Sequence, residues 1–195
     1  MVVVKAEVRS QIIDVARKIF TRYGFRKTTM EEIAIATGKG KSSIYYYFPG
    51  KEDIFRAVVE REVSELRQHL AFSIGKDERP DAKLKAYMLF RLHHVRTLSN
   101  FYAALNEEDL SHLDFILDIR QKFEEEERKI LRSILAEGMQ RGQFQIKSAE
   151  IGAVAISTMM KGLELPLFLS ADYKGERELV LDDVIRVLFS GILKR

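Results

Sequence analysis

The chain has 195 residues, a formal net charge of +3, and a composition that is 46% hydrophobic and 31% charged. This balance, with only three prolines, is that of a folded protein and disfavours disorder. The absence of cysteine excludes disulfides, thiolate metal sites and a cysteine nucleophile. No apolar run approaches the roughly 18 residues of a membrane helix, and the N-terminal apolar run is too short for a secretory signal, so we expect a cytoplasmic protein.

The positive charge is concentrated toward the N-terminal end. Residues 1–55 hold ten Lys and Arg against six Asp and Glu, a net of +4, whereas residues 56–195 hold 22 against 23, a net of −1. Clustered cations of this kind are typical of a surface that binds phosphate groups.

Two helices are predicted in this basic region. The first spans residues 5–23, where apolar side chains recur at the spacing of one helical face, and Gly24 ends it. The second begins at a capping box, with Thr29 as the N-cap and Glu32 as the third helical residue. We expect this short helix to end at Thr37–Gly38.

The segment 38–51 predicts a third helix with a contact surface. Ile44 and Phe48 lie four residues apart on one face, which should be buried, and Pro49–Gly50 stops the helix before another begins at Lys51. At about 100° per residue, the side chains turned away from that face are polar or aromatic. Small residues around the preceding turn let two helices cross closely, as in a DNA-binding helix-turn-helix.

Three motifs lie in this region: Tyr-Gly-Phe at 23–25, Thr-Thr at 28–29 and Ile-Tyr-Tyr-Tyr-Phe-Pro-Gly-Lys-Glu at 44–52. With them, the sequence from about residue 12 to 55 resembles the DNA-binding region of the TetR family of bacterial transcription regulators. Helix geometry and this resemblance together predict which side chains contact DNA. The predicted contact residues are Thr29, Lys39, Lys41, Ser42, Ser43, Tyr45, Tyr46, Tyr47 and Lys51.

Gly40-Lys41-Ser42 also spells the end of a nucleotide-binding phosphate loop. Such a loop needs a glycine five residues before the second glycine and an apolar strand ahead of it. Ile35 occupies that position, inside a helix-period pattern. The sequence therefore favours the recognition helix over a nucleotide site.

A long helix begins at Lys51, and its mainly apolar stripe, which includes Glu62, continues to about Ile74. Lys51 lies in the first turn, where free amides and the helix dipole attract phosphate. No flexible linker interrupts this helix, so we place the domain boundary inside its first turns. Residues 1–55 are predicted to form the DNA-binding domain and residues 56–195 a helical domain for effector binding and dimerisation.

Apolar periodicity predicts only helices in the remaining chain, so the expected fold class is all-α. Five helices are expected there. They cover Leu84–Val95, Phe101–Leu105 (a short helix), Ser111 to near Gly138–Gly142 (the longest), Ser148–Pro166 and about Glu178–Leu193.

The second domain is rich in aromatic and methionine side chains, which suit an apolar cavity as well as a core. Because the family resemblance implies an effector, we predict a ligand cavity among them. Its predicted lining is Tyr87, Phe90, Phe101, Tyr102, Phe123, Glu127 and Met159. Glu127 falls in line with apolar residues, so it is either an interface or partly wet position, or an acid that contacts a cationic ligand.

The last helix carries apolar residues on two stripes, whereas the core of one protomer needs only one. A second apolar face implies a partner surface, and the simplest solution is a two-fold homodimer in which the last two helices pack against their copies. The predicted interface residues are Val154, Gly162, Val184, Ile185, Val187 and Leu188.

No catalytic or metal site is evident in the sequence. His93 and His94 are neighbours on a helix, so they point about 100° apart and cannot chelate one ion together. No nucleophile lies at a sensible spacing from a base, which argues against an enzyme. We expect no cofactor.

These patterns predict a ligand-responsive DNA-binding transcription regulator, and most simply a repressor released from a palindromic operator by a small apolar or amphipathic effector. The expected partners are double-stranded DNA, the effector and a second copy of the chain. The main alternative is an architectural protein that binds DNA without sequence preference. The tyrosines and serines of the outward face favour base readout over that alternative.

Overall fold

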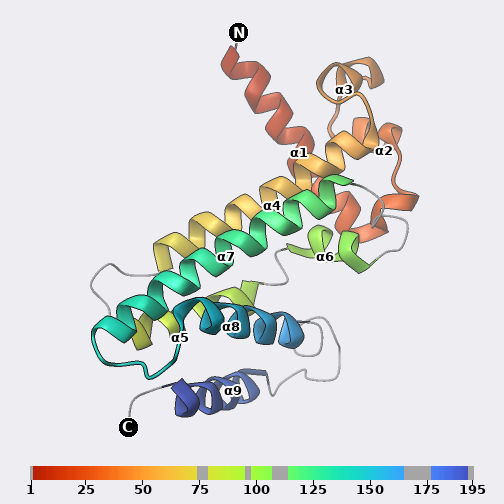
Figure 1. Cartoon of the computed structure of the whole chain (residues 1–195). Coiled ribbons are helices and arrows are strands. Elements are labelled where there is room, and N and C mark those ends of the chain that lie inside the picture. The colour runs from red at the N-terminus through yellow and green to blue at the C-terminus, as the bar shows by residue number, and fades with distance from the viewer. Residues whose placement is uncertain (1, 74–78, 95–97, 107–113, 165–176, 193–195) are drawn as a thin grey trace. The chain divides into compact units, whose positions relative to one another are not determined.

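The computed structural model describes residues 2–73, 79–94, 98–106, 114–164 and 177–192. Within these ranges the chain is helical, which confirms the all-α prediction (Figure 1). The helices are α1 (Val2–Lys27), α2 (Met30–Ala36), α3 (Lys41–Tyr47), α4 (Lys51–Ser73), α5 (Pro80–His93), α6 (Ser99–Asn106), α7 (Asp114–Gln140), α8 (Ala149–Glu164) and α9 (Arg177–Ile192). No helix among the described residues combines the length and apolar character needed to cross a membrane.

The chain forms two compact units. The first unit comprises Met1–Glu65 and Leu98–Ile119, and the second comprises Leu66–Thr97 and Arg120–Arg195. Both α4 and α7 contribute residues to each unit. The functional boundary at residue 55 stays a prediction, since these units describe packing alone.

The regular part of α1 breaks at Gly24, where the sequence predicts its end. Gly24 has a φ of 78°, a left-handed conformation that favours glycine. The reversal brings Phe25 back against the core, with its ring centroid 5.9 Å from that of Phe20 and 4.9 Å from that of Phe55. This aromatic cluster joins the end of α1 to the first turns of α4.

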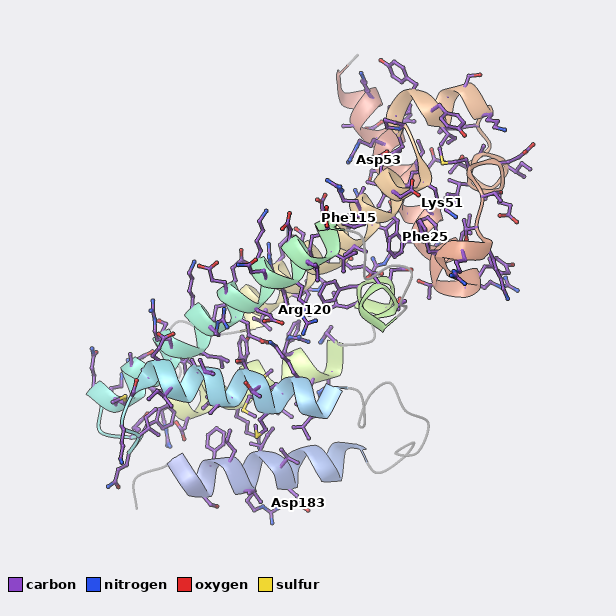
Figure 2. The ribbon with its side chains drawn as sticks, turned by 45° about the vertical axis from the view of Figure 1, so that its right-hand side comes forward. Phe25, Lys51, Asp53, Phe115, Arg120 and Asp183 are labelled. Carbon is purple, nitrogen blue, oxygen red and sulfur yellow. The ribbon has the colours of Figure 1, made fainter. Side chains whose placement is uncertain are left out.

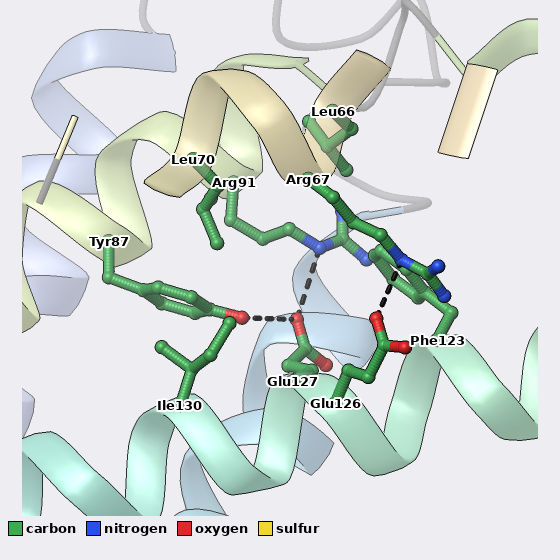
Figure 3. Close-up of a pocket in the computed structure, with 9 residues that line it drawn as sticks. All are labelled: Leu66, Arg67, Leu70, Tyr87, Arg91, Phe123, Glu126, Glu127 and Ile130. Atoms are coloured by element: carbon green, nitrogen blue, oxygen red, sulfur yellow. Dashed lines mark hydrogen bonds and ion pairs between the residues drawn. The ribbon is translucent and has the colours of Figure 1, made fainter. Parts of the chain in front are cut away.

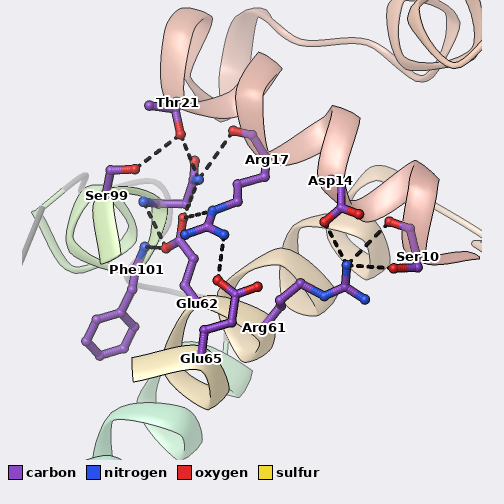
Figure 4. Close-up of polar contacts among 10 residues, drawn as sticks. Ser10, Asp14, Arg17, Thr21, Arg61, Glu62, Glu65, Ser99 and Phe101 are labelled. Atoms are coloured by element: carbon purple, nitrogen blue, oxygen red, sulfur yellow. Dashed lines mark hydrogen bonds and ion pairs between the residues drawn. The ribbon is translucent and has the colours of Figure 1, made fainter. Parts of the chain in front are cut away.

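A buried carboxylate holds α1, α4 and α6 together within the first unit (Figure 4). Glu62 on α4 is only 1% exposed. Its Oε2 accepts hydrogen bonds from the backbone N–H groups of Asn100 and Phe101, at 3.2 and 3.1 Å, in the first turn of α6. Its Oε1 accepts from Asn100 Nδ2 at 2.7 Å and lies 3.3 Å from Nε of Arg17 on α1. Glu62 therefore satisfies two of the free amides at the start of α6.

Two arginines add further ties between α1 and α4. Arg17 donates from Nη1 to Glu65 at 2.7 Å, and Arg61 donates from Nη1 to Asp14, also at 2.7 Å. Arg61 also donates to the hydroxyl of Ser10 at 3.0 Å. These contacts fix the register of the two long helices along their shared length.

In the second unit, apolar residues of α5, α7 and α8 form the core. Leu84, Met88 and Leu92 of α5, Leu131 and Leu135 of α7, and Ala153, Ile156 and Met160 of α8 are buried. Figure 2 shows the side chains that lie between α8 and α9. The end of α7 needs Gly138, because a Cβ there would overlap the ring of Phe144.

Replacing Glu62 with glutamine should destabilise the first unit. Four N–H groups converge on two carboxylate oxygens, and glutamine replaces one of these acceptors with a donor. Burial raises the pKa of the Glu62 carboxyl, while the hydrogen bonds from Asn100 and Phe101 lower it. At pH 8 we expect Glu62→Gln to lower the free energy of unfolding in urea by about 1–3 kcal/mol, the typical cost of a buried polar group left unsatisfied.

Glu65→Gln is the matched control, because Glu65 also pairs with Arg17 but its side chain is 43% exposed. An exposed ion pair is typically worth about 1 kcal/mol or less. Equal losses for the two variants would contradict the structural role assigned to Glu62.

Candidate nucleic-acid interface and ligand cavity

The helix-turn-helix is built by local caps. Oγ1 of Thr29 accepts from the backbone N–H of Glu32 at 3.2 Å, and the Glu32 carboxylate accepts from the backbone N–H of Thr29 at 2.8 Å. This is the predicted capping box. At the other end of α2, the hydroxyl of Thr37 donates to the carbonyl of Ile33 at 2.8 Å, and Gly38 turns the chain with a φ of 65°. Both helix ends are thus fixed by residues close in sequence.

One face of α3 packs against the rest of the first unit, and the opposite face is exposed to solvent. Ile44 and Phe48 are buried, as their spacing predicts. Tyr46 is 67% exposed, and Tyr45, Ser42 and Lys41 are also exposed, whereas Ser43, Tyr47 and Lys39 are half-buried. The open face therefore presents hydroxyl, aromatic and ammonium groups, which can hydrogen-bond to base edges and phosphates.

Two cations of α1 reach the third helix, and the sequence patterns did not identify them. Nζ of Lys5 lies 4.6 Å from the ring centroid of Tyr46, and the guanidinium of Arg9 lies 4.9 Å from that of Phe48. A hydrogen bond with the Tyr46 hydroxyl raises the pKa of Lys5. The excess of basic residues near the N-terminus was the available signal, and only the fold shows that α1 brings them to α3.

The predicted phosphate anchor Lys51 makes contacts within the chain. Its Nζ donates to the carbonyl oxygen of Phe25 at 2.9 Å and lies 4.3 Å from the centroid of that ring (Figure 2). An ammonium group has three N–H donors, so two remain for a phosphate. Lys51 thus joins the start of α4 to the end of α1.

The second unit contains a cavity of about 120 Å³ bounded by α4, α5 and α7 (Figure 3). Its walls are mainly apolar, with four charged residues among them. The lining residues are Leu66, Arg67, Leu70, Tyr87, Arg91, Phe123, Glu126, Glu127 and Ile130.

Glu127 is the polar centre of this cavity, and its side chain points from α7 toward Tyr87 and Arg91 (Figure 3). It is 3% exposed. Its Oε1 accepts from the hydroxyl of Tyr87 at 3.2 Å and from Nε of Arg91 at 3.0 Å, whereas its Oε2 has no hydrogen-bond partner among the described residues. The guanidinium of Arg91 lies 4.7 Å from the ring centroid of Phe123. A second, more exposed pair joins Arg67 to Glu126 at 2.7 Å.

The structure brings three of the predicted cavity residues together: Tyr87, Phe123 and Glu127. Phe90 instead stacks on His94, Phe101 is buried in the first unit, and Met159 is half-buried on α8 away from the lining. The Tyr102 side chain is outside the described part of the chain.

The lining residues that sequence reasoning missed are Leu66, Arg67, Leu70, Arg91, Glu126 and Ile130. The helical spacing of Leu66 and Leu70, and of Tyr87 and Arg91, was a usable signal, because residues four apart share a face.

The predicted dimer residues differ in exposure. Val187 is 75% exposed, and Val154 and Gly162 are also exposed, which leaves them accessible to a partner. Val184 and Leu188 are half-buried. Ile185 is 4% exposed and belongs to the core of its own protomer. A charge at Ile185 would therefore disturb the protomer itself and is unsuitable as a test of dimerisation.

Comparisons with known proteins agree with this geometry. Residues 12–58 match the family described as bacterial regulatory proteins, tetR family. The transcriptional regulator TtgR of Pseudomonas putida is 28% identical over 165 residues, which cover 80% of this chain and 78% of that protein.

Solved structures agree along nearly the whole chain. A transcriptional regulator from Cytophaga hutchinsonii has a TM-score of 0.77 at 25% identity, covering 94% of this chain and 97% of that one. One from Saccharomonospora viridis, solved in complex with choline, has a TM-score of 0.75 at 18% identity, covering 97% and 100%. The latter likeness concerns the fold alone.

Proposed function

Because the chain belongs to the TetR family of bacterial transcriptional regulators, we propose that it is a repressor that leaves a palindromic operator when a small molecule fills the cavity. The observation that carries this proposal is the exposed face of α3, which presents polar and aromatic groups, while the opposite face is apolar and buried. The chain would act in the cytoplasm, where its DNA target lies. The relatives described above are regulators, and we propose no enzymatic activity.

We assign the DNA contacts by their positions on the helix-turn-helix. Lys41, Ser42, Ser43 and Tyr46 reach base edges or nearby phosphates. Thr29, Tyr45, Tyr47 and Lys51 anchor the phosphate backbone, and Lys39 is a further DNA contact. The exposure of Lys41, Ser42 and Tyr46 supports the first group. Thr29 is also exposed, although its hydroxyl takes part in the capping box.

The effector proposal rests on the cavity and on its place along α4. Leu66, Arg67 and Leu70 line the cavity, and the same helix begins at Lys51, directly after the helix-turn-helix. A ligand that packs against α4 therefore touches the helix that carries the DNA-binding segment. It changes DNA affinity only if it binds the DNA-competent and incompetent states unequally, with typical coupling of about 1–3 kcal/mol. Binding of choline by the Saccharomonospora viridis protein supports a small-molecule effector in this fold.

Selection of binding sites from random-sequence duplexes tests the DNA proposal. We expect a palindrome or near-palindrome, with half-sites separated by about 34–36 Å or a multiple of it, because a two-fold dimer presents two copies of α3. Lys41→Ala should weaken binding to the selected site by about 1–3 kcal/mol, with little effect on random DNA, if Lys41 reads a base. Fluorescence anisotropy with both duplexes measures these affinities.

Lys147→Ala is the matched control, since it removes one exposed positive charge from the second unit. Losses of equal size on selected and random DNA for Lys41→Ala would assign Lys41 to the phosphate backbone. An equal loss for Lys147→Ala would show that only net charge matters and would contradict the assigned surface.

Sedimentation velocity tests the dimer. Val187→Glu places a charge on an exposed apolar position of α9, so the variant should keep its helical content but sediment as a monomer at micromolar concentration. Leu117→Glu, which changes an exposed leucine of α7 in the first unit, should remain dimeric. A monomeric wild-type chain would refute the dimer, and a dimeric Val187→Glu variant would move the interface away from this face.

A further inference from the structure

The charges of the cavity and the unsatisfied Oε2 of Glu127 indicate which chemical class of molecule it would take. This inference rests on the proposed function, since it names the effector of the same regulator. Leu66, Leu70, Phe123 and Ile130 provide apolar walls, and Glu127 is the nearly fully buried acid among them.

Only one oxygen of Glu127 is satisfied within the described chain. Oε1 accepts two hydrogen bonds, from Tyr87 and Arg91, whereas Oε2 is buried without a partner. Native proteins supply a partner to most buried polar atoms, because a buried unsatisfied acceptor lowers stability. A carboxylate oxygen only accepts, so the missing group is an O–H or N–H donor.

The charge balance selects a neutral donor. Arg91 compensates Glu127 at 3.0 Å, and Arg67 compensates Glu126 at 2.7 Å, so the lining carries two cations and two anions. A cationic ligand would meet the guanidinium of Arg91 beside Glu127, and an anionic ligand would face the free oxygen of Glu127. Each would bury an uncompensated charge, which is costly in an apolar site. The cationic ligand considered from the sequence is therefore disfavoured.

The volume limits the size of the ligand. A dry engineered cavity of roughly 150 Å³ holds one benzene molecule. The present cavity of about 120 Å³ is of that order. We propose that the effector is a neutral, compact molecule about the size of one aromatic ring, with a hydroxyl or N–H group that donates to Oε2 of Glu127.

Calorimetric titration of the full-length protein with four probes of similar size tests this proposal: phenol, toluene, benzoate and benzylammonium. A hydrogen bond to a charged group should make phenol bind roughly tenfold to 150-fold more tightly than toluene. Benzoate and benzylammonium should bind more weakly than phenol. Equal affinities for phenol and toluene, or tighter binding of either charged probe, would overturn the proposal.

Two variants test whether the preference for phenol over toluene depends on Glu127. Glu127→Gln replaces an acceptor with a donor, so the preference for phenol over toluene should disappear. Glu126→Gln changes the neighbouring, partly exposed glutamate at the same cavity and should keep it. Far-UV circular dichroism confirms that each variant is folded. If Glu127→Gln does not fold, the four-probe comparison on the wild type still decides the question. A phenol preference retained in folded Glu127→Gln would contradict the role of Oε2.

This experiment separates the ligand class from the proposed function. Binding of phenol with the expected preference, but without any effect on operator affinity, would support the ligand class and contradict the repressor's release. Specific operator binding with no preference among the probes would leave the regulator in place and overturn the ligand class.

Discussion

The buried carboxylate of Glu62 is the constraint on which the packing of the first unit depends. Removing this charge from water is costly, and the cost is offset only because Asn100, Phe101 and Arg17 together direct donors at both oxygens. The arrangement requires α1, α4 and the start of α6 to keep one relative position. Together with the Lys51–Phe25 and Arg61–Asp14 contacts, it ties α4 to α1 along the whole length from residue 51 to 65. A displacement of this part of α4 would therefore carry the helix-turn-helix with it.

In the proposed mechanism, the ligand cavity acts through the continuation of the same helix. Leu66 and Leu70 follow directly on the segment of α4 that Glu62 and Glu65 anchor. A ligand between these leucines and Glu127 can favour one position of the helix over another, and its effect on DNA is limited to that difference in affinity. The ligand proposed above would act through its shape and one hydrogen bond to Oε2 of Glu127.

Sequence reasoning succeeded where the determinants are local. The capping box at Thr29 and Glu32, the break at Gly24 and the buried pair Ile44 and Phe48 follow from short-range spacing, and the structure confirms them. Domain packing and pairing between helices are tertiary properties, which a single sequence does not encode in an obvious pattern. Glu62 was visible only as an acid within an apolar stripe, while its partners Arg17 and Asn100 lie 45 and 38 residues away in sequence.

The cavity lining and the dimer face also depend on tertiary packing, which the sequence pattern does not show. Aromatic residues give the same sequence pattern whether they fill a core or line a cavity. The sequence therefore did not distinguish Phe101, in the core of the first unit, from Phe123, in the cavity lining of the second. The sequence pattern showed two apolar stripes on α9, but it did not show which stripe is buried within the protomer. Burial answers that question for Ile185 and Val187.

The coupling between the cavity and the DNA-binding surface is tested most directly by a thermodynamic cycle between ligand and operator. Operator affinity is measured by fluorescence anisotropy with the cavity empty and with it saturated by a ligand that calorimetry shows to bind there. Ligand affinity is then measured for the free protein and for the operator complex. We expect a 5–150-fold loss of operator affinity and an equal loss of ligand affinity in the complex, because coupling between two sites is reciprocal. Unchanged operator affinity with the cavity occupied would contradict this coupling.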